Sequence, residues 1–377
     1  MKLTENAVNN IKRNRLFYFK FIPTAALLML TAALLLVHPE AAADGVKRGM
    51  SLCLSTVIPS LFPFLLVTTA AYDIGMFDVL SEKAEKLTRF LFALPGASFP
   101  VIAMSLIGGF PVGAHLIEKA LDKGELTYAE AQRMLLFCVN PGPAFTVSAI
   151  GAGVLGSKQA GIIIYICVSA VSLLTGVLSR FFTDDEVKAH REKTAIKGFF
   201  NSSAVTAAVN SSIRAITNIC VWVVVFSCAD SLLQSLVSNG QLLMFFRLIF
   251  EVTNGAVTAS EHFNLPIIAA VISFAGLCVH FQIMPCIIRA RMKYKYFLAV
   301  RALSAALTSA LAFLVTRLFP ESCEVISLGV KPQQTALDVS FPVCVWLMLM
   351  CGLFIIGDNY IIAKKAKKTE GECGSLY

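Results

Sequence analysis

The stretch Ser105-Leu-Ile-Gly-Gly-Phe-Pro-Val-Gly-Ala-His-Leu-Ile-Glu-Lys-Ala120 begins like a membrane-spanning helix, breaks on glycines and a proline, and then becomes charged. Lipid offers no hydrogen-bond partners, so irregular backbone at membrane depth is stable only inside protein or beside a wet cavity. We therefore favour an unwound tip buried within the protein. The alternative is a close-packing motif, because Gly109 and Gly113 also form a G-x-x-x-G pair.

The composition around this stretch is that of a polytopic membrane protein. Of 377 residues, 56% are hydrophobic and only 15% are charged. The 32 Lys and Arg against 24 Asp and Glu give a net charge of +8. The basic residues collect at the ends of apolar runs, which indicates membrane topology and not a nucleic-acid-binding surface.

A span needs about 20 largely apolar residues, and eight runs are candidates. They are residues 21–37, 49–72, 134–156, 160–182, 215–237, 265–288, 297–319 and 341–357. The first run, preceded by basic residues and followed by Ala41-Ala-Ala43, also resembles a cleaved signal peptide. Its apolar part is longer than the usual ~7–15 residues, so we favour an uncleaved first span.

Two further apolar stretches, 97–113 and 241–257, are too short or too interrupted to cross as regular helices. Placing every basic stretch in the cytoplasm requires 97–113 to enter and leave on that side, as a re-entrant hairpin. The same reasoning makes 241–257 a hairpin from the opposite side. Residues 77–92 carry an apolar stripe between basic residues, which is typical of an interfacial helix or of a soluble loop helix.

The predicted fold is therefore all-α, with about eight transmembrane helices and two re-entrant hairpins in an inverted repeat. Each half contains a span, a hairpin and two more spans, in opposite orientations, as in many secondary transporters. The predicted divisions are an N-terminal transmembrane helix (1–44), a first repeat (45–182), a cytoplasmic linker (183–210), a second repeat (211–320) and a C-terminal transmembrane helix with a basic tail (321–377).

Polar residues inside spans are costly and often functional. Asn140-Pro-Gly-Pro143 interrupts the third span, and its free backbone groups or a half-helix N-terminus there could bind an ion. Glu251 has a simpler alternative, a salt bridge with Arg247 at helical spacing. Arg301 lies nearer a span end, where snorkelling or capping is expected.

Enzymatic motifs fail on context, and we expect no enzyme, no cofactor and no bound metal. Gly151-Ala-Gly153-Val-Leu-Gly156 matches a nucleotide-binding pattern but lies in an apolar helical region with no strand before it. No nucleophile and base are recognisably set together.

A series of motifs resembles the YlbJ-type sporulation integral membrane protein family, over residues 45–320. The motifs are Leu61-Phe-Pro-Phe64, Gly108-Gly-Phe-Pro-Val-Gly-Ala114, Lys123-Gly-Glu-Leu-Thr127, Glu130-Ala-Gln-Arg133, Phe137-Cys-Val-Asn-Pro-Gly-Pro-Ala-Phe145, Gly153-Val-Leu-Gly156, Glu251-Val-Thr-Asn-Gly255 and Phe274-Ala-Gly-Leu-Cys-Val-His-Phe-Gln-Ile283. That family belongs to the nucleoside-recognition or Gate domain group, distantly similar to concentrative nucleoside transporters.

The resemblance implies an endospore-forming bacterium and movement of dipicolinic acid across the mother-cell-derived outer forespore membrane. It leaves open a nucleoside or other metabolite transporter, and a non-transporting scaffold for spore assembly. Expected partners are membrane lipid and a small-molecule substrate, with homo-oligomerisation left open. The predicted substrate-binding residues are Gly109, Phe110, Pro111, Gly113, Asn140, Gly142, Phe145, Glu251, Asn254, Gly255, Gly276, His280 and Gln282.

Overall fold

The computed structural model describes residues 22, 25–26, 28–182 and 202–319, and within these ranges the chain forms helices and no strands. The predicted all-α class is confirmed. In the first half lie α2 (Pro39–Leu52), η1 (Cys53–Val57), α3 (Ile58–Asp73), α4 (Asp78–Phe92), α5 (Ser98–Gly108), α6 (Val112–Asp122), α7 (Tyr128–Phe137), η2 (Ala144–Val154), α8 (Lys158–Ser179) and η3 (Arg180–Phe182). In the second half lie α9 (Ser202–Leu236), α10 (Gly240–Phe250), α11 (Val252–His262), α12 (Leu265–Phe274), α13 (Gly276–Gln282), α14 (Met284–Arg289) and α15 (Tyr294–Leu318).

Apart from α4 and α14, the order of elements is the same in both halves. In the first, α3 and then α4 are followed by a pair of short helices, α5 and α6, by a broken helix, α7 and η2, and by α8. In the second, α9 is followed by α10 and α11, by the broken helix α12 and α13, and, after α14, by α15. We call α5–α6 the first hairpin and α10–α11 the second hairpin.

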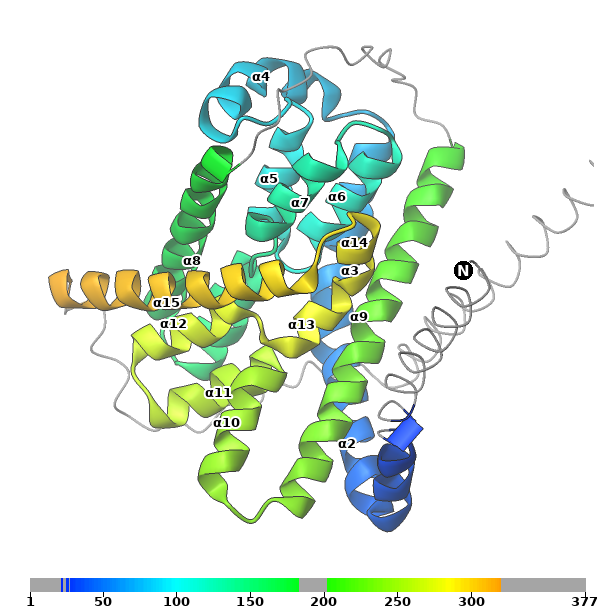
Figure 1. Cartoon of the computed structure of the whole chain (residues 1–377), viewed down its shortest axis with the longest axis vertical. Helices are drawn as coiled ribbons and strands as arrows, with labels where there is room; N and C mark the ends of the chain where they lie inside the picture. The colour runs from blue at the N-terminus through cyan, green and yellow to red at the C-terminus, as the bar shows by residue number, and fades with distance from the viewer. Residues whose placement is uncertain (1–21, 23–24, 27, 183–201, 320–377) are drawn as a thin grey trace, which may run out of the picture.

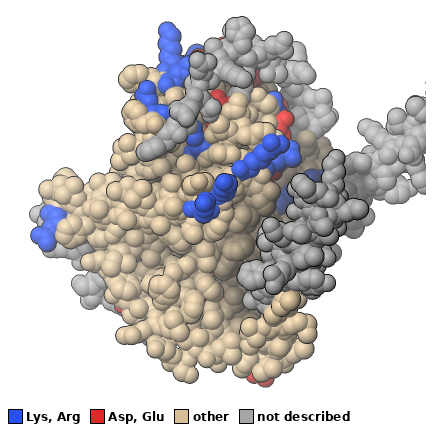
Figure 2. All heavy atoms as spheres, viewed as in Figure 1, with Lys and Arg blue, Asp and Glu red and all other residues tan. Residues whose placement is uncertain are grey.

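The two hairpins lie at opposite ends of the molecule. Figure 1 shows α5 and α6 in the upper half of the view and α10 and α11 in the lower half. Figure 2 shows Lys and Arg over the upper half of the same face, while the lower half is almost free of charge. This arrangement is the one expected if the upper end faces the cytoplasm and the hairpins enter from opposite sides.

Four described helices are long and apolar enough to cross a membrane: Lys158–Ser179, Thr206–Leu236, Leu265–Gln282 and Tyr294–Leu318. A bent pair, Leu28–Val37 and Pro39–Ser55, which meet at 99°, raises the number to five. Many large apolar side chains on these helices are exposed, which suits contact with lipid. The protein is thus a multi-pass membrane protein, and the count of eight spans stays a prediction.

Two of the predicted spans are not continuous helices. The predicted span 134–156 is divided by residues 138–143, which lie between α7 and η2 and in which two prolines lack backbone donors. The predicted span 265–288 is interrupted at Ala275 and Gly276, both with positive φ, of 73° and 62°. We call residues 138–143 the first break and Ala275–Gly276 the second break.

Other boundaries also differ from the predicted ones. Helix α9 begins at Ser202, so residues 202–210 of the predicted linker are helical. The predicted helix over 77–92 is present as α4, in which Ala84 is buried while Leu80 and Leu87 are partly exposed. The predicted span 341–357 and the basic tail lie outside the described residues, as does most of the chain before residue 28.

The candidate spans are not all parallel. Figure 1 shows α8 and α9 running along the long axis of the view, whereas α15 crosses it and α12 lies beside α15. The halves nevertheless share a core, because one hydrophobic cluster contains residues of α3, α5, α6 and α7 together with residues of α9, α13 and α14. The breaks and hairpin tips lie within this shared core.

Candidate functional site

The tip of the first hairpin packs on the first break through backbone. Gly109 has a φ of +76°, and a Cβ there would overlap the backbone nitrogen of Gly142. A Cβ on Gly113 would overlap the carbonyl oxygen of Cys138 and the Ser105 side chain, so the two arms of the hairpin are also in close contact. Only glycine permits these approaches. The predicted tip at Gly109–Gly113 is therefore a tightly packed turn between two helices.

The second hairpin meets the second break in the same manner. A Cβ on Gly276 would lie 2.8 Å from the backbone nitrogen of Val252 and 3.2 Å from the carbonyl carbon of Glu251. Gly255 packs on the other arm of its hairpin, since a Cβ there would lie 3.1 Å from the carbonyl oxygen of Arg247. In both halves, a hairpin tip thus contacts the break of the following helix.

At each break, a polar side chain hydrogen-bonds to a backbone carbonyl oxygen. Asn140 Nδ2 donates to the Phe137 carbonyl oxygen at 2.7 Å, and its Oδ1 accepts from the Ser172 hydroxyl. His280 Nε2 lies 2.9 Å from the Phe274 carbonyl oxygen and Nδ1 lies 3.0 Å from the Tyr294 hydroxyl. A carbonyl can only accept, so Nε2 carries the proton. Each side chain therefore satisfies a carbonyl that the helix break leaves without its usual donor.

Glu251 occupies the tip of the second hairpin and caps α11. Its carboxylate accepts from the backbone N–H of Thr253 at 3.0 Å and of Asn254 at 2.7 Å. The alternative role of Glu251, a salt bridge with Arg247, is wrong, because Arg247 pairs with Asp230 at 3.0 Å. Glu251 is 4% exposed, so a buried carboxylate already occupies the electropositive end of this half-helix.

The structure collects the predicted residues into two groups. Phe110 lies edge-on to Phe145 at 6.4 Å and joins the first group with the glycines and Asn140. Glu251, Asn254 and Gly255 form the second group with the residues of α13. There, Gln282 is buried and donates to the Cys278 sulfur at 3.3 Å. Phe110, Val139, Val252 and Ala275 all belong to the shared core, which joins the two groups.

Sequence reasoning missed Arg301. It does not snorkel from a span end; it is 2% exposed and lies against the Phe297 ring at 5.4 Å. Its Nη1 makes one long contact of 3.5 Å with the Ser273 carbonyl oxygen. The available signal was a charged residue within the apolar run 297–319.

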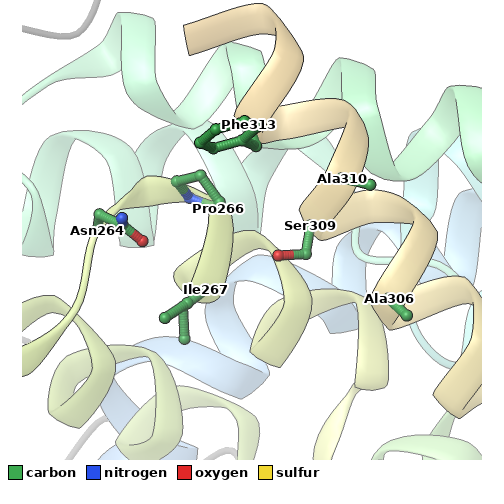
Figure 3. A pocket seen from close by; sticks show the side chains of 7 residues that line it. All are labelled: Asn264, Pro266, Ile267, Ala306, Ser309, Ala310 and Phe313. Carbon is green, nitrogen blue, oxygen red and sulfur yellow. The ribbon is translucent and has the colours of Figure 1, made fainter. Parts of the chain in front are cut away.

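A surface hollow of about 530 Å³ lies elsewhere, between α12 and α15. Figure 3 shows Ile267, Ser309 and Phe313 among its lining side chains. Ile267 and Phe313 are partly exposed and mostly apolar atoms line the hollow, so it resembles a lipid-facing groove. None of the residues at the breaks or tips lines it. The part of the chain that the structure describes also contains no cluster of metal-ligating side chains.

Comparison with known proteins finds a homologue in Bacillus subtilis (strain 168), the sporulation integral membrane protein YlbJ. The two chains are 23% identical over 332 residues, which is 77% of this chain and 81% of the relative. The chain is related to the YlbJ-type sporulation integral membrane proteins. The resemblance expected from the motifs is thus confirmed. No protein-family model and no solved structure matches the chain.

Proposed function

We propose that the protein transports a small organic anion, dipicolinic acid, across the outer forespore membrane of an endospore-forming bacterium. A membrane protein with two hairpins and two broken helices in matching order has the architecture of a secondary transporter. The role in sporulation is supported by the relationship to the sporulation integral membrane protein YlbJ, and dipicolinate and the outer forespore membrane are what the family resemblance of the motifs implies.

The observation that carries this proposal is that each hairpin tip lies on the helix break of its own half, inside one shared core. Gly109 lies on Gly142 in the first half, and Val252 lies on Gly276 in the second. A protein that only supported spore assembly would gain nothing from interrupting two helices and repairing each with a buried polar side chain, because unbroken helices satisfy their own backbone. Paired breaks suit a substrate site between the halves.

Uptake by vesicles containing the purified protein tests the proposal. We expect radiolabelled dipicolinate to accumulate in these vesicles and not in empty ones, and unlabelled dipicolinate to compete. Labelled uridine is the matched uncharged substrate. Uptake of uridine without dipicolinate would indicate a nucleoside transporter instead, and uptake of neither would indicate a scaffold.

A further inference from the structure

Arg301 is a buried cation with no described counterion. Its Nε and Nη2 atoms are buried and have no hydrogen-bond partner. None of the ion pairs formed among residues 28–182 and 202–319 involves it. Burying an unpaired charge costs several kcal/mol, so such a group is retained where it serves a function.

The other buried arginine shows how a structural guanidinium is accommodated. Arg133 donates to the carbonyl oxygens of Phe92 and Ala93, the latter at 3.1 Å, and so caps the end of α4. Arg301 has one contact with a backbone acceptor, the Ser273 carbonyl oxygen in the last turn of α12, and this contact is at the limit of a hydrogen bond. Arg133 is 9% exposed and Arg301 is 2% exposed, but only Arg133 donates to two backbone acceptors.

Arg301 lies where the two broken helices approach each other. Ser273, which it contacts, belongs to the last turn of α12 just before the second break. The His280 ring, just after the second break, and the Arg301 guanidinium both lie against the Phe297 ring, at 5.1 Å and 5.4 Å, and α15 also contacts α7, which ends at the first break. A ligand bound there would therefore contact both halves of the molecule.

The free atoms of Arg301 have the geometry of a carboxylate site. Nε and Nη2 lie on one edge of the planar guanidinium, and their N–H groups point in the same direction. A carboxylate accepts two parallel hydrogen bonds from such an edge, which a Lys ammonium cannot provide. Phe297, in van der Waals and cation–π range, covers the group from water and strengthens the pairing.

We propose that Arg301 binds a carboxylate of the transported anion, through Nε and Nη2. This inference rests on the proposed function for the identity of the anion. It also gives two carboxylates different roles: Glu251 caps α11 as part of the protein, and the substrate supplies the missing acidic partner of Arg301.

Binding of dipicolinate and of its uncharged diamide to the full chain in detergent, measured by calorimetry, tests this assignment. We expect R301Q to bind dipicolinate at least about tenfold more weakly than wild type, the size of one charge-assisted pair. R301K should fall between them, because it keeps the charge but loses the second hydrogen bond. R317Q is the matched control, because Arg317 is exposed on the same helix.

Ligand-free melting temperature separates binding from structure. Removing an unpaired buried charge should leave the melting temperature of R301Q equal to or above that of wild type, with dipicolinate stabilising only wild type and R317Q. Should R301Q fail to fold, R301K decides: a folded R301K that binds dipicolinate as tightly as wild type overturns the assignment, and weaker binding by a folded R301K supports it.

The outcomes distinguish this assignment from the proposed function. Wild-type vesicles that accumulate dipicolinate, with R301Q binding it unchanged, would overturn the Arg301 assignment alone. Arg301-dependent binding without uptake would overturn transport and keep the binding site. A wild-type protein that binds dipicolinate no better than the diamide would overturn the Arg301 assignment whatever it transports.

Discussion

The tips of the two hairpins, where one short helix ends and the next begins, are stabilised in different ways. At the first tip, α6 begins after Pro111 without a side-chain cap, and glycines on both surfaces allow backbone to pack on backbone. At the second tip, one residue separates α10 from α11, and that residue, Glu251, caps α11 with its carboxylate. The first tip depends on the absence of side chains and the second on one particular side chain.

This difference shows that equivalent positions need not carry equivalent chemistry. Gly113 and Gly255 occupy matching places in α6 and α11, yet the first has far less room. Asn140 and His280 each hydrogen-bond to a carbonyl oxygen before a break, Asn140 through its amide and His280 through its imidazole. Matched substitutions in the two halves therefore test which tip is the more constrained.

The largest expected effect is that of Gly113→Ala. Its Cβ would overlap the Cys138 carbonyl oxygen, so we expect a loss of about 3 kcal/mol or more of stability. Gly255→Ala should lie within about 1 kcal/mol of wild type, because a 3.1 Å contact is offset by the better helix propensity of Ala. Melting in detergent measures both.

Gly240→Ala controls for the gain in helix propensity, since nothing lies within 4 Å of a Cβ at that position. Equal losses for the Gly113 and Gly255 variants would mean that the two hairpins are packed alike, contrary to the comparison.

An intermediate effect is expected from the side chains that repair the breaks. His280→Leu leaves the Phe274 carbonyl without the imidazole donor and should cost about 1–3 kcal/mol. Asn140→Leu should cost about 1 kcal/mol or less, because the Ser172 hydroxyl lies 2.9 Å from the Phe137 carbonyl and can replace the lost donor. Melting temperature again reports the difference.

The double variant Asn140→Leu with Ser172→Ala sharpens this test. Removing both donors should bring the cost in the first half up to that of His280→Leu, with clear non-additivity. Strict additivity of the two substitutions would show that Ser172 does not substitute for Asn140.

The most local expected effect is that of Glu251→Ala. Loss of the cap on the Thr253 and Asn254 amides should cost about 1 kcal/mol and raise hydrogen exchange in the first turn of α11. Glu261→Ala, an exposed position on the same helix, should leave exchange unchanged. No change in exchange for the Glu251 variant would mean that its carboxylate does not hold this end of the helix.

Sequence predicted the breaks that contain proline better than those that do not. Gly108-Gly109 and the prolines at 111, 141 and 143 indicated both interruptions in the first half. The second break has only Ala275 and Gly276, and a single glycine is compatible with a continuous helix, so 265–288 was predicted as one span. Positive φ at Ala275 depends on tertiary packing and has no local signal.

The sequence predicted which residues lie near the breaks and tips, but not which hydrogen-bond partners they have. The polar side chains of Asn140, Glu251 and His280 within apolar segments suggested ligand contacts, whereas the structure shows all three already engaged with backbone. Arg301 was assigned to a span end because α15 was expected to start at 297 and run straight out of the protein. Its burial comes from the crossing of α15 over the other helices, which sequence periodicity does not report.

The backbone contact of Gly109 with Gly142 also constrains how such a chain can diverge. A relative that is 23% identical has exchanged most of its side chains, and the core can follow because one apolar side chain replaces another. Two glycines in contact have no side chain to exchange, and any replacement would separate the tip from the break. Substitutions that keep this contact are therefore confined to the residues that surround the two glycines.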